Sequence, residues 1–250
     1  MTNKYKYFVA NWKMFGDLKS LNTLNRVLKL KKSIKFDKAK IIYCPPYTLL
    51  ESFNKKLKST KIDIGAQNCH PLDEYGPFTG SINSKMVKKL GCKYIILGHS
   101  ENRFEGETNN LINKKIKVSL NNKLKVLFCI GESLKQKKEN ITKKVLSKQI
   151  LEGLKNIKNL NNIIIAYEPV WSIGTGIIPK KSDLEENIFF IRKFLKKKLR
   201  IKNPVILYGG SVNSKNINEL RTINQINGFL IGGASQNSNK FIDIIKKTFI

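Results

Sequence analysis

The chain has 250 residues, of which 41% are hydrophobic, and its 47 Lys and Arg against 18 Asp and Glu give a formal net charge of +29. This hydrophobic content excludes a disordered chain, and no apolar run approaches the ~20 residues that a membrane-spanning helix requires. Residues 1–4 lead straight into an apolar stretch and leave no room for a signal peptide, so we expect a cytoplasmic protein without a membrane partner.

The excess of basic residues allows two interpretations. One is a surface that binds nucleic acid. The lysines, however, cluster at helical spacing among apolar residues, as in 29–32, 135–138 and 196–198, and no basic platform with interleaved aromatic residues is present. We therefore expect a solvated basic surface, with nucleic acid an unlikely partner and a secondary nucleic-acid-binding role as the alternative.

Eight short apolar runs recur along the chain at regular intervals. They cover residues 5–10, 40–44, 62–66, 93–97, 124–129, 163–167, 204–208 and 228–231. Their length and branching predict buried β-strands. The stretches between them have helical periodicity, as in 184–200, where the apolar positions 184, 188, 191, 194 and 195 share one face.

Eight strands that alternate with helices predict a closed, parallel (β/α)8 barrel, which is an α/β fold. No linker rich in Pro, Gly or Ser divides the chain, so residues 1–250 are expected to form one catalytic domain. An open doubly wound sheet is disfavoured because the first run is followed by NWKMFGDL and not by the fingerprint G-x-G-x-x-G.

The four cysteines are far apart in the sequence, at Cys44, Cys69, Cys92 and Cys129, and none forms a CxxC pair. This spacing disfavours both a disulfide framework and a zinc site. Free, mostly buried thiols are expected.

Candidate functional residues follow the predicted strands, where the reactive groups of such barrels lie. In chain order they are Asn11, Lys13, His99, Glu101, Glu168, Gly209–Gly210–Ser211 and Gly232–Gly233. Asn11 and Lys13 are two residues apart and would share one face of an extended chain. The glycine pairs suit a phosphate group, because a glycine has no side chain to keep its backbone N–H group away from the phosphate oxygens.

Each of these features also has an ordinary structural explanation. A lysine at a strand end can simply face solvent, a histidine can be only hydrogen-bonded, and a glycine pair can be a turn. Glu168 could likewise cap the turn that follows it. Their joint occurrence at one rim of the barrel favours a catalytic site.

Several longer motifs point to one family. They are VANWKMF (9–15), GAQNCH (65–70), ILGHSE (96–101), CIGE (129–132), AYEPVWSIGTG (166–176), YGGSV (208–212) and LIGGAS (230–235). In their order and spacing the chain resembles the triosephosphate isomerase family from end to end. The resemblance implies a TIM barrel that interconverts dihydroxyacetone phosphate and D-glyceraldehyde 3-phosphate through an enediolate, in glycolysis and gluconeogenesis, without metal or organic cofactor. The alternative is another phosphate-binding barrel isomerase, which would explain YGGS and IGGAS but not the full lysine–histidine–glutamate set.

The resemblance also implies roles for the candidate residues. By this resemblance, Glu168 occupies the position of the family's base, which moves the proton. His99 occupies the position of the electrophile, a neutral imidazole at the start of a helix. Lys13 and Asn11 would bind the phosphate and the enediolate oxygens, and Glu101 would support Lys13 and His99. The remaining substrate-binding groups implied by the family are Gly174, Ser211, Gly232 and Gly233.

Residues 169–176 resemble the lid of this family. Pro169, Val170 and Trp171 would form a stiff hinge, and Gly174–Thr175–Gly176 the tip that grips the phosphate and excludes water. At the far hinge, GIIP (176–179) replaces the lysine–threonine–alanine ending that is common in the family, so the family pattern does not fix the rate of lid closure here.

The segment 67–80, QNCHPLDEYGPFTG, is long for a loop in a compact domain and carries apolar residues. In the family this loop inserts into a partner subunit, which implies a homodimer. Two positions depart from the family together: Ser81 stands where a Glu usually follows FTG, and Asn102 where an Arg usually follows GHSE. By resemblance these two form an ion pair between subunits, and both halves are absent here.

Overall fold

A computed structural model describes residues 5–175 and 177–250 of the chain. Eight parallel strands close into a barrel in the order β1 to β8, with β8 paired to β1. The strands are β1 (Lys6–Asn11), β2 (Ala39–Cys44), β3 (Asp63–Ala66), β4 (Tyr94–Leu97), β5 (Lys125–Ile130), β6 (Ile163–Tyr167), β7 (Val205–Tyr208) and β8 (Gly228–Ile231). The predicted fold class is confirmed, and each strand boundary differs from its predicted position by no more than one residue.

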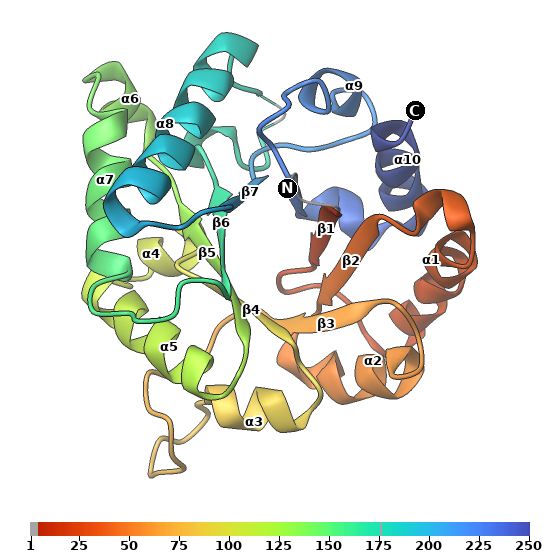
Figure 1. Cartoon of the computed structure of the whole chain (residues 1–250). Coiled ribbons are helices and arrows are strands. Elements are labelled where there is room, and N and C mark those ends of the chain that lie inside the picture. Colours follow the sequence, from red (N-terminus) through yellow and green to blue (C-terminus); the bar gives the residue numbers. More distant parts are fainter. Residues whose placement is uncertain (1–4, 176) are drawn as a thin grey trace.

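The helices surround the barrel as an outer ring (Figure 1). They are α1 (Leu24–Lys31), α2 (Leu50–Leu57), α3 (Ser84–Lys89), α4 (Ser100–Phe104), α5 (Asn109–Asn121), α6 (Leu134–Lys138), α7 (Thr142–Gly153), α8 (Lys181–Leu199), α9 (Ile217–Leu220) and α10 (Ser238–Thr248). Short 3₁₀ helices are η1 (Leu18–Thr23), η2 (Ile34–Phe36), η3 (Tyr47–Leu49), η4 (Val170–Ser172) and η5 (Gly233–Gln236). In α8, the predicted face buries Leu184, Ile188, Ile191 and Leu195, and Phe194 packs against the core from a partly buried position.

The strands read as continuous apolar runs because both of their faces are buried. In β5, Val126 and Phe128 pack outward against the helices, whereas Leu127 and Cys129 point into the barrel. The interior cluster is filled by Val9, Ile42, Cys44, Tyr94, Ile96, Leu127, Cys129, Ile164, Ala166, Leu207 and Leu230. The barrel is therefore a packed core, and a ligand can enter only at its ends.

Closure of the barrel requires a glycine at the start of β8. The N–H of Tyr7 donates to the carbonyl of Asn227 at 2.9 Å, which draws β1 tightly against β8. A Cβ atom at Gly228 would lie 2.1 Å from the carbonyl oxygen of Tyr7. No residue with a side chain could occupy this position without moving a strand.

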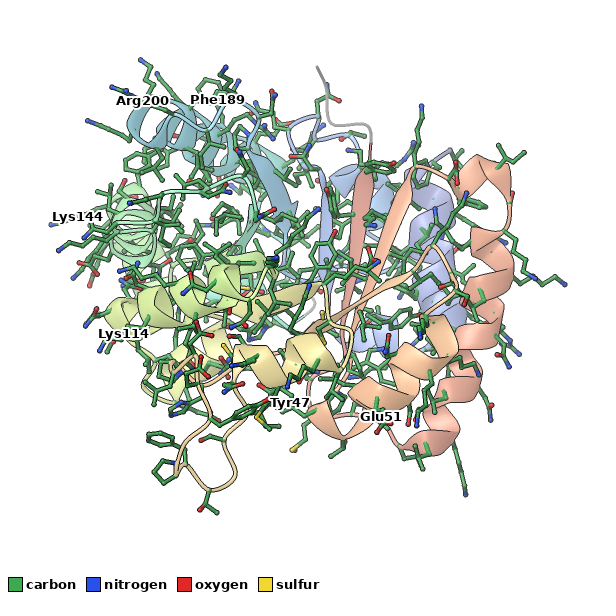
Figure 2. All side chains as sticks on the ribbon, turned by 60° about the horizontal axis from the view of Figure 1, so that its bottom comes forward. Tyr47, Glu51, Lys114, Lys144, Phe189 and Arg200 are labelled. Atoms are coloured by element: carbon green, nitrogen blue, oxygen red, sulfur yellow. The ribbon has the colours of Figure 1, made fainter. Side chains whose placement is uncertain are left out.

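Basic side chains lie mainly on the outer faces of the helices. Figure 2 shows Lys114 of α5 and Lys144 of α7 pointing away from the barrel. This placement is the one expected for a solvated basic surface. All four cysteines are buried and unpaired, as predicted, and among the described residues no helix is long and apolar enough to span a bilayer.

Candidate active site

A pocket of about 480 Å³ opens at the carboxyl ends of the strands. Every residue predicted for the site other than Glu101 lines this pocket: Asn11, Lys13, His99, Glu168, Gly174, Ser211, Gly232 and Gly233. These residues come from the ends of five strands and from the segment after η4, and the parallel closed sheet brings them to one rim. Gly176, at the tip of the predicted lid, lies outside the described residues.

Glu168 follows β6 directly and is only 2% exposed. Its Oε1 atom has no hydrogen-bond partner among the described residues. Burial raises the pKa of this carboxyl above its usual range, and the nearby His99 ring, the Cys129 thiol and the Lys13 ammonium offset only part of that effect. A carboxylate that is removed from water is a stronger base than one in water.

Two glycines make room for Glu168. A Cβ atom at Gly131 would lie 1.7 Å from the carbonyl oxygen of Glu168, and one at Gly209 would lie 2.6 Å from its Cγ. The Glu168 N–H donates to the carbonyl of Ile130 at 2.8 Å, and the Gly209 N–H donates to the carbonyl of Tyr167 at 2.8 Å. The two neighbouring strands thus hold Glu168 in place through their backbones.

The buried carboxylate leads to a prediction about stability. We expect Glu168→Gln to raise the melting temperature near pH 7.5 by roughly 3 °C, which corresponds to about 1 kcal/mol for a protein of this size. The folded protein holds the Glu168 proton more tightly than the unfolded chain does, because the pKa is raised. Wild-type stability should therefore fall as the pH rises from about 4.3, the usual pKa of Glu, through the raised value, and then level off.

Thermal unfolding between pH 4.5 and pH 8 measures this effect. The advantage of Glu168→Gln should be smallest at the acid end and grow with pH. Glu105→Gln, which removes an exposed carboxylate, is the control and should show no such trend. An advantage that is absent at pH 7.5 or independent of pH would show that Glu168 is not strained by its burial.

His99 caps the first turn of α4. Its Nδ1 atom accepts the N–H of Glu101 at 3.2 Å, so Nδ1 carries no proton and the ring is neutral with its proton on Nε2. The Nε2 atom lies 3.6 Å from Oε1 of Glu168. The geometry places a neutral N–H donor beside the Glu168 carboxylate, and both groups line the pocket.

Lys13 adopts a left-handed backbone conformation, with φ of 56°. The expectation that Asn11 and Lys13 share a face of an extended chain is therefore wrong, because β1 ends at Asn11 and the chain turns sharply after it. The turn is held by Asn11 Oδ1, which accepts the Lys13 N–H at 3.2 Å, and by Gln67 Nε2, which donates to the Lys13 carbonyl at 2.9 Å. A strained residue held this way is typical of functional sites.

Glu101 contacts both neighbours that the sequence suggested. Its Oε1 accepts from Nζ of Lys13 at 2.5 Å, and its Oε2 lies 3.6 Å from Nδ1 of His99. The pair fixes the lysine ammonium at the edge of the pocket. Glu101 itself does not line the pocket, so it can act only through Lys13 and His99.

The first hinge of the predicted lid is anchored by a second buried carboxylate, that of Glu132. This carboxylate accepts the Nε1–H of Trp171 at 3.1 Å and the hydroxyl of Tyr167 at 3.1 Å. Ser172 Oγ lies 3.1 Å from the Tyr208 hydroxyl and donates to the carbonyl of Ile177 at 2.7 Å. These contacts hold both described flanks of the predicted lid, and Gly174, with φ of 71°, lines the pocket.

The two glycine-rich segments after β7 and β8 form another wall of the pocket. The 3₁₀ helix η5 begins at Gly233. The backbone N–H groups of these glycines, which no side chain covers, therefore lie at the start of a helical turn. Trp12 ties this wall to β1, since its Nε1 donates to the carbonyl of Ser235 at 3.2 Å and its own carbonyl accepts from Gln236 at 3.1 Å. Such a wall suits a phosphate group.

The arrangement as a whole can remove a proton from carbon. Glu168 can accept the proton, and the Nε2–H of His99 can stabilise an oxygen that becomes negative. Lys13 and the glycine-rich wall can hold an anionic group in the same pocket. Fold and site together define a phosphate-binding barrel enzyme that works by acid–base chemistry.

Comparison with known proteins narrows this class. A family model described as triosephosphate isomerase matches residues 6–248. A triosephosphate isomerase of Dictyoglomus thermophilum is 40% identical over 253 residues, covering 96% of this chain and 98% of the relative. That of Carboxydothermus hydrogenoformans is 41% identical over 249 residues, with 96% and 98% covered. The crystal structure of the Bartonella henselae triosephosphate isomerase has a TM-score of 0.88 and 35% identity, with 97% of this chain and 98% of that chain covered. The chain belongs to the triosephosphate isomerase family, and it is an aldose–ketose isomerase.

Three residues that support the site were not predicted from the sequence. Gln67 and Gly131 lie within the quoted motifs GAQNCH and CIGE, but nothing in their spacing indicates that they hold Lys13 and Glu168. Cys129 is the third case. Burial raises the pKa of its thiol, and the nearby Glu168 carboxylate raises it further. A protonated thiol therefore faces the Glu168 carboxylate.

Proposed function

We propose that this protein interconverts dihydroxyacetone phosphate and D-glyceraldehyde 3-phosphate at the pocket described above. The observation that carries the proposal is the buried Glu168 carboxylate, whose Oε1 atom has no hydrogen-bond partner among the described residues and lies 3.6 Å from Nε2 of His99. Residues 1–250 would act as a single catalytic domain. The role in glycolysis and gluconeogenesis follows from the reaction itself.

The proposed reaction assigns one task to each group. Glu168 takes a proton from the carbon next to the substrate carbonyl and returns it to the adjacent carbon. Between these steps the substrate is an enediolate, whose oxygens receive hydrogen bonds from Nε2–H of His99 and charge stabilisation from Lys13. Asn11, which is buried at the end of β1, adds a hydrogen bond on the Lys13 side.

The phosphate would be bound by backbone groups of Ser211, Gly232 and Gly233, and by the Gly174 N–H when the lid closes. Closure excludes water, which would otherwise allow the enediolate to lose phosphate. The lid also removes solvent from Glu168, which strengthens its basicity further.

A coupled dehydrogenase assay tests the reaction. With D-glyceraldehyde 3-phosphate as substrate, the dihydroxyacetone phosphate formed is reduced by glycerol-3-phosphate dehydrogenase, and loss of NADH absorbance reports turnover. Sustained turnover supports the proposal. The alternative, another phosphate-binding barrel isomerase, would give no turnover with this substrate although phosphate still binds.

We also propose that the protein is cytoplasmic and forms a homodimer, with the loop 67–80 at the interface between the subunits. Figure 1 shows the segment between β3 and α3 projecting from the barrel. Exposed apolar side chains gather on three connections that follow β1, β3 and β4. They are Met14, Phe15, Leu18, Leu72, Tyr75, Phe78 and Phe104, with Met14 99% and Phe104 94% exposed.

The projecting loop is preformed. Asn83 Nδ2 donates to the Glu74 carbonyl at 3.0 Å, and Nζ of Lys85 lies 2.7 Å from the Glu74 carboxylate. The rings of His70 and Phe78 pack against each other, with centroids 4.6 Å apart and planes tilted by 35°. A fixed loop loses little conformational entropy on docking, which favours association.

The dimer should tighten as salt is raised. Each subunit carries a formal charge of +29, so two subunits repel each other, and the Glu–Arg pair of the family is replaced by Ser81 and Asn102. Salt screens charge over about 10 Å at 0.1 M, which weakens the repulsion and leaves apolar contacts intact. Sedimentation velocity over a dilution series at 20 mM and 300 mM salt measures the dissociation constant.

Phe104→Ser is the matched control for this experiment. It removes an exposed apolar group without a change of charge, so it should weaken the dimer at both salt concentrations. A wild-type dimer that is equally tight or weaker at high salt would show that the surface charges lie away from the interface.

A further inference from the structure

The active-site pocket extends beyond the groups that the proposed reaction uses. Past Ser211 and Gly233 it is lined by Asn213, Ser214, Lys215, Ala234 and Lys240. We call these five residues the annex. They come from the connection between β7 and α9, from η5 and from the beginning of α10. Lys215 and Lys240 are exposed.

The annex carries positive charge that is not neutralised locally. Lys13, which also lines the pocket, is paired with Glu101. In contrast, none of the ion pairs between described residues includes Lys215 or Lys240. Glu168 is the one carboxylate among the described pocket-lining residues, and it lies beside His99.

The backbone that carries the annex is well fixed. Asn213 Oδ1 accepts the N–H groups of Lys215 and Asn216 at 2.8 and 3.2 Å. Nζ of Lys247 donates to the Ser214 carbonyl at 3.0 Å and is itself paired with Asp243 at 2.9 Å. Lys215 therefore projects from a turn that is held on both sides.

In the proposed binding mode, a single triose phosphate does not use this region. With its phosphate on the glycine-rich wall and its carbons beside Glu168 and His99, it leaves the two annex lysines without an anion. The pocket volume of about 480 Å³ is in the range that binds larger, drug-sized molecules. The annex thus has the charge, the polar groups and the space to receive a second anion.

We propose that the annex binds the second phosphate of a small bisphosphorylated molecule whose first phosphate occupies the glycine-rich wall. Such a molecule competes with the triose phosphate and inhibits the isomerase. The proposal rests on the proposed function, because it takes the glycine-rich wall as a phosphate site. Linking two phosphates makes the second contact intramolecular, so weak contacts at exposed lysines add to a measurable preference.

The test compares matched ligands on the full chain. The probes are straight-chain alkanediol bisphosphates of three to six carbons and alkyl monophosphates of the same lengths. Binding is measured by calorimetry at 20 mM salt, and inhibition by the coupled assay. We expect at least one bisphosphate to bind about tenfold more tightly than its monophosphate, with a smaller ratio at 200 mM salt because salt screens exposed charges.

Two double variants locate the effect. Lys215→Gln with Lys240→Gln should reduce the ratio of monophosphate to bisphosphate dissociation constants to about one. Lys196→Gln with Lys197→Gln makes the same change in net charge at the carboxyl end of α8, at the opposite end of the barrel, and should keep the wild-type ratio. The ratio within each variant cancels any general change in phosphate binding.

The outcomes separate the annex from the reaction. A wild-type ratio near one, or a ratio that the annex variant retains, overturns the inference even if the isomerase is fully active. Absence of isomerase activity overturns the proposed function, while calorimetry still measures whether the annex binds a second phosphate. A ratio that both double variants lose equally would mean that overall charge, and not the annex, attracts the second phosphate, and would also overturn the inference.

Discussion

Glu168→Asp should lower kcat by about 100-fold or more while KM changes only a few-fold, because a misplacement of about 1 Å in a reacting group can have an effect of that size. The backbone of Glu168 cannot follow the shortened side chain. It is fixed by its N–H bond to Ile130 and by the close approach of Gly131 and Gly209. Loss of one methylene therefore withdraws the carboxylate from the substrate carbon, and no phosphate contact changes.

Steady-state kinetics in both directions would measure the split between kcat and KM. The matched control is Glu51→Asp, which makes the same change on the outer face of α2 (Figure 2) and should leave both constants unaltered. A near-normal kcat in Glu168→Asp would remove Glu168 from the role of base. A loss confined to KM would reassign it to substrate binding.

The barrel could be predicted from the sequence because its strands are buried on both faces. Two-sided burial requires unbroken apolar runs such as 163–167, and these are visible without any neighbour. The number and length of the helices in the connections were harder to predict. Those from β4 to β5 and from β5 to β6 each contain two α-helices among the described residues, and that from β7 to β8 contains only α9, of four residues. Short helices depend on tertiary packing more than on local periodicity.

The residues of the site could be predicted because parallel strands end at one rim, so position along the chain already implies proximity. Their precise supports could not. The left-handed turn at Lys13 depends on Gln67, which is 54 residues away in sequence, and the room for Glu168 depends on Gly131 and Gly209 from two other strand ends. Such contacts are set by the closing of the barrel, which no local pattern records. The pairing of Lys13 with Glu101, by contrast, was anticipated from the family resemblance.

Gly209→Ala should have the second large effect on catalysis. Its Cβ atom would lie 2.6 Å from Cγ and 3.0 Å from Oε1 of Glu168, whereas real Cβ contacts are rarely closer than about 3.4 Å. The φ angle of Gly209 is not positive, so alanine can adopt the backbone conformation at this position. The clash therefore falls on a side chain, which must turn away. We expect kcat to fall by about 100-fold, on the same positional argument as for Glu168→Asp.

Gly233→Ala is the matched control, because its added methyl would meet no described atom within 4 Å. Gly233 faces the proposed phosphate, so this substitution should act on KM and leave kcat within a few-fold of wild type. Circular dichroism and thermal unfolding of both variants would show whether the fold is kept, since each adds a single methyl. If Gly209→Ala retained wild-type kcat, the Glu168 carboxylate would have to work from a second position, and its tight placement beside His99 would not be what makes it the base. If both substitutions changed only KM, Gly209 would belong to the phosphate-binding wall with Gly233, and the base would owe its position to Gly131 alone.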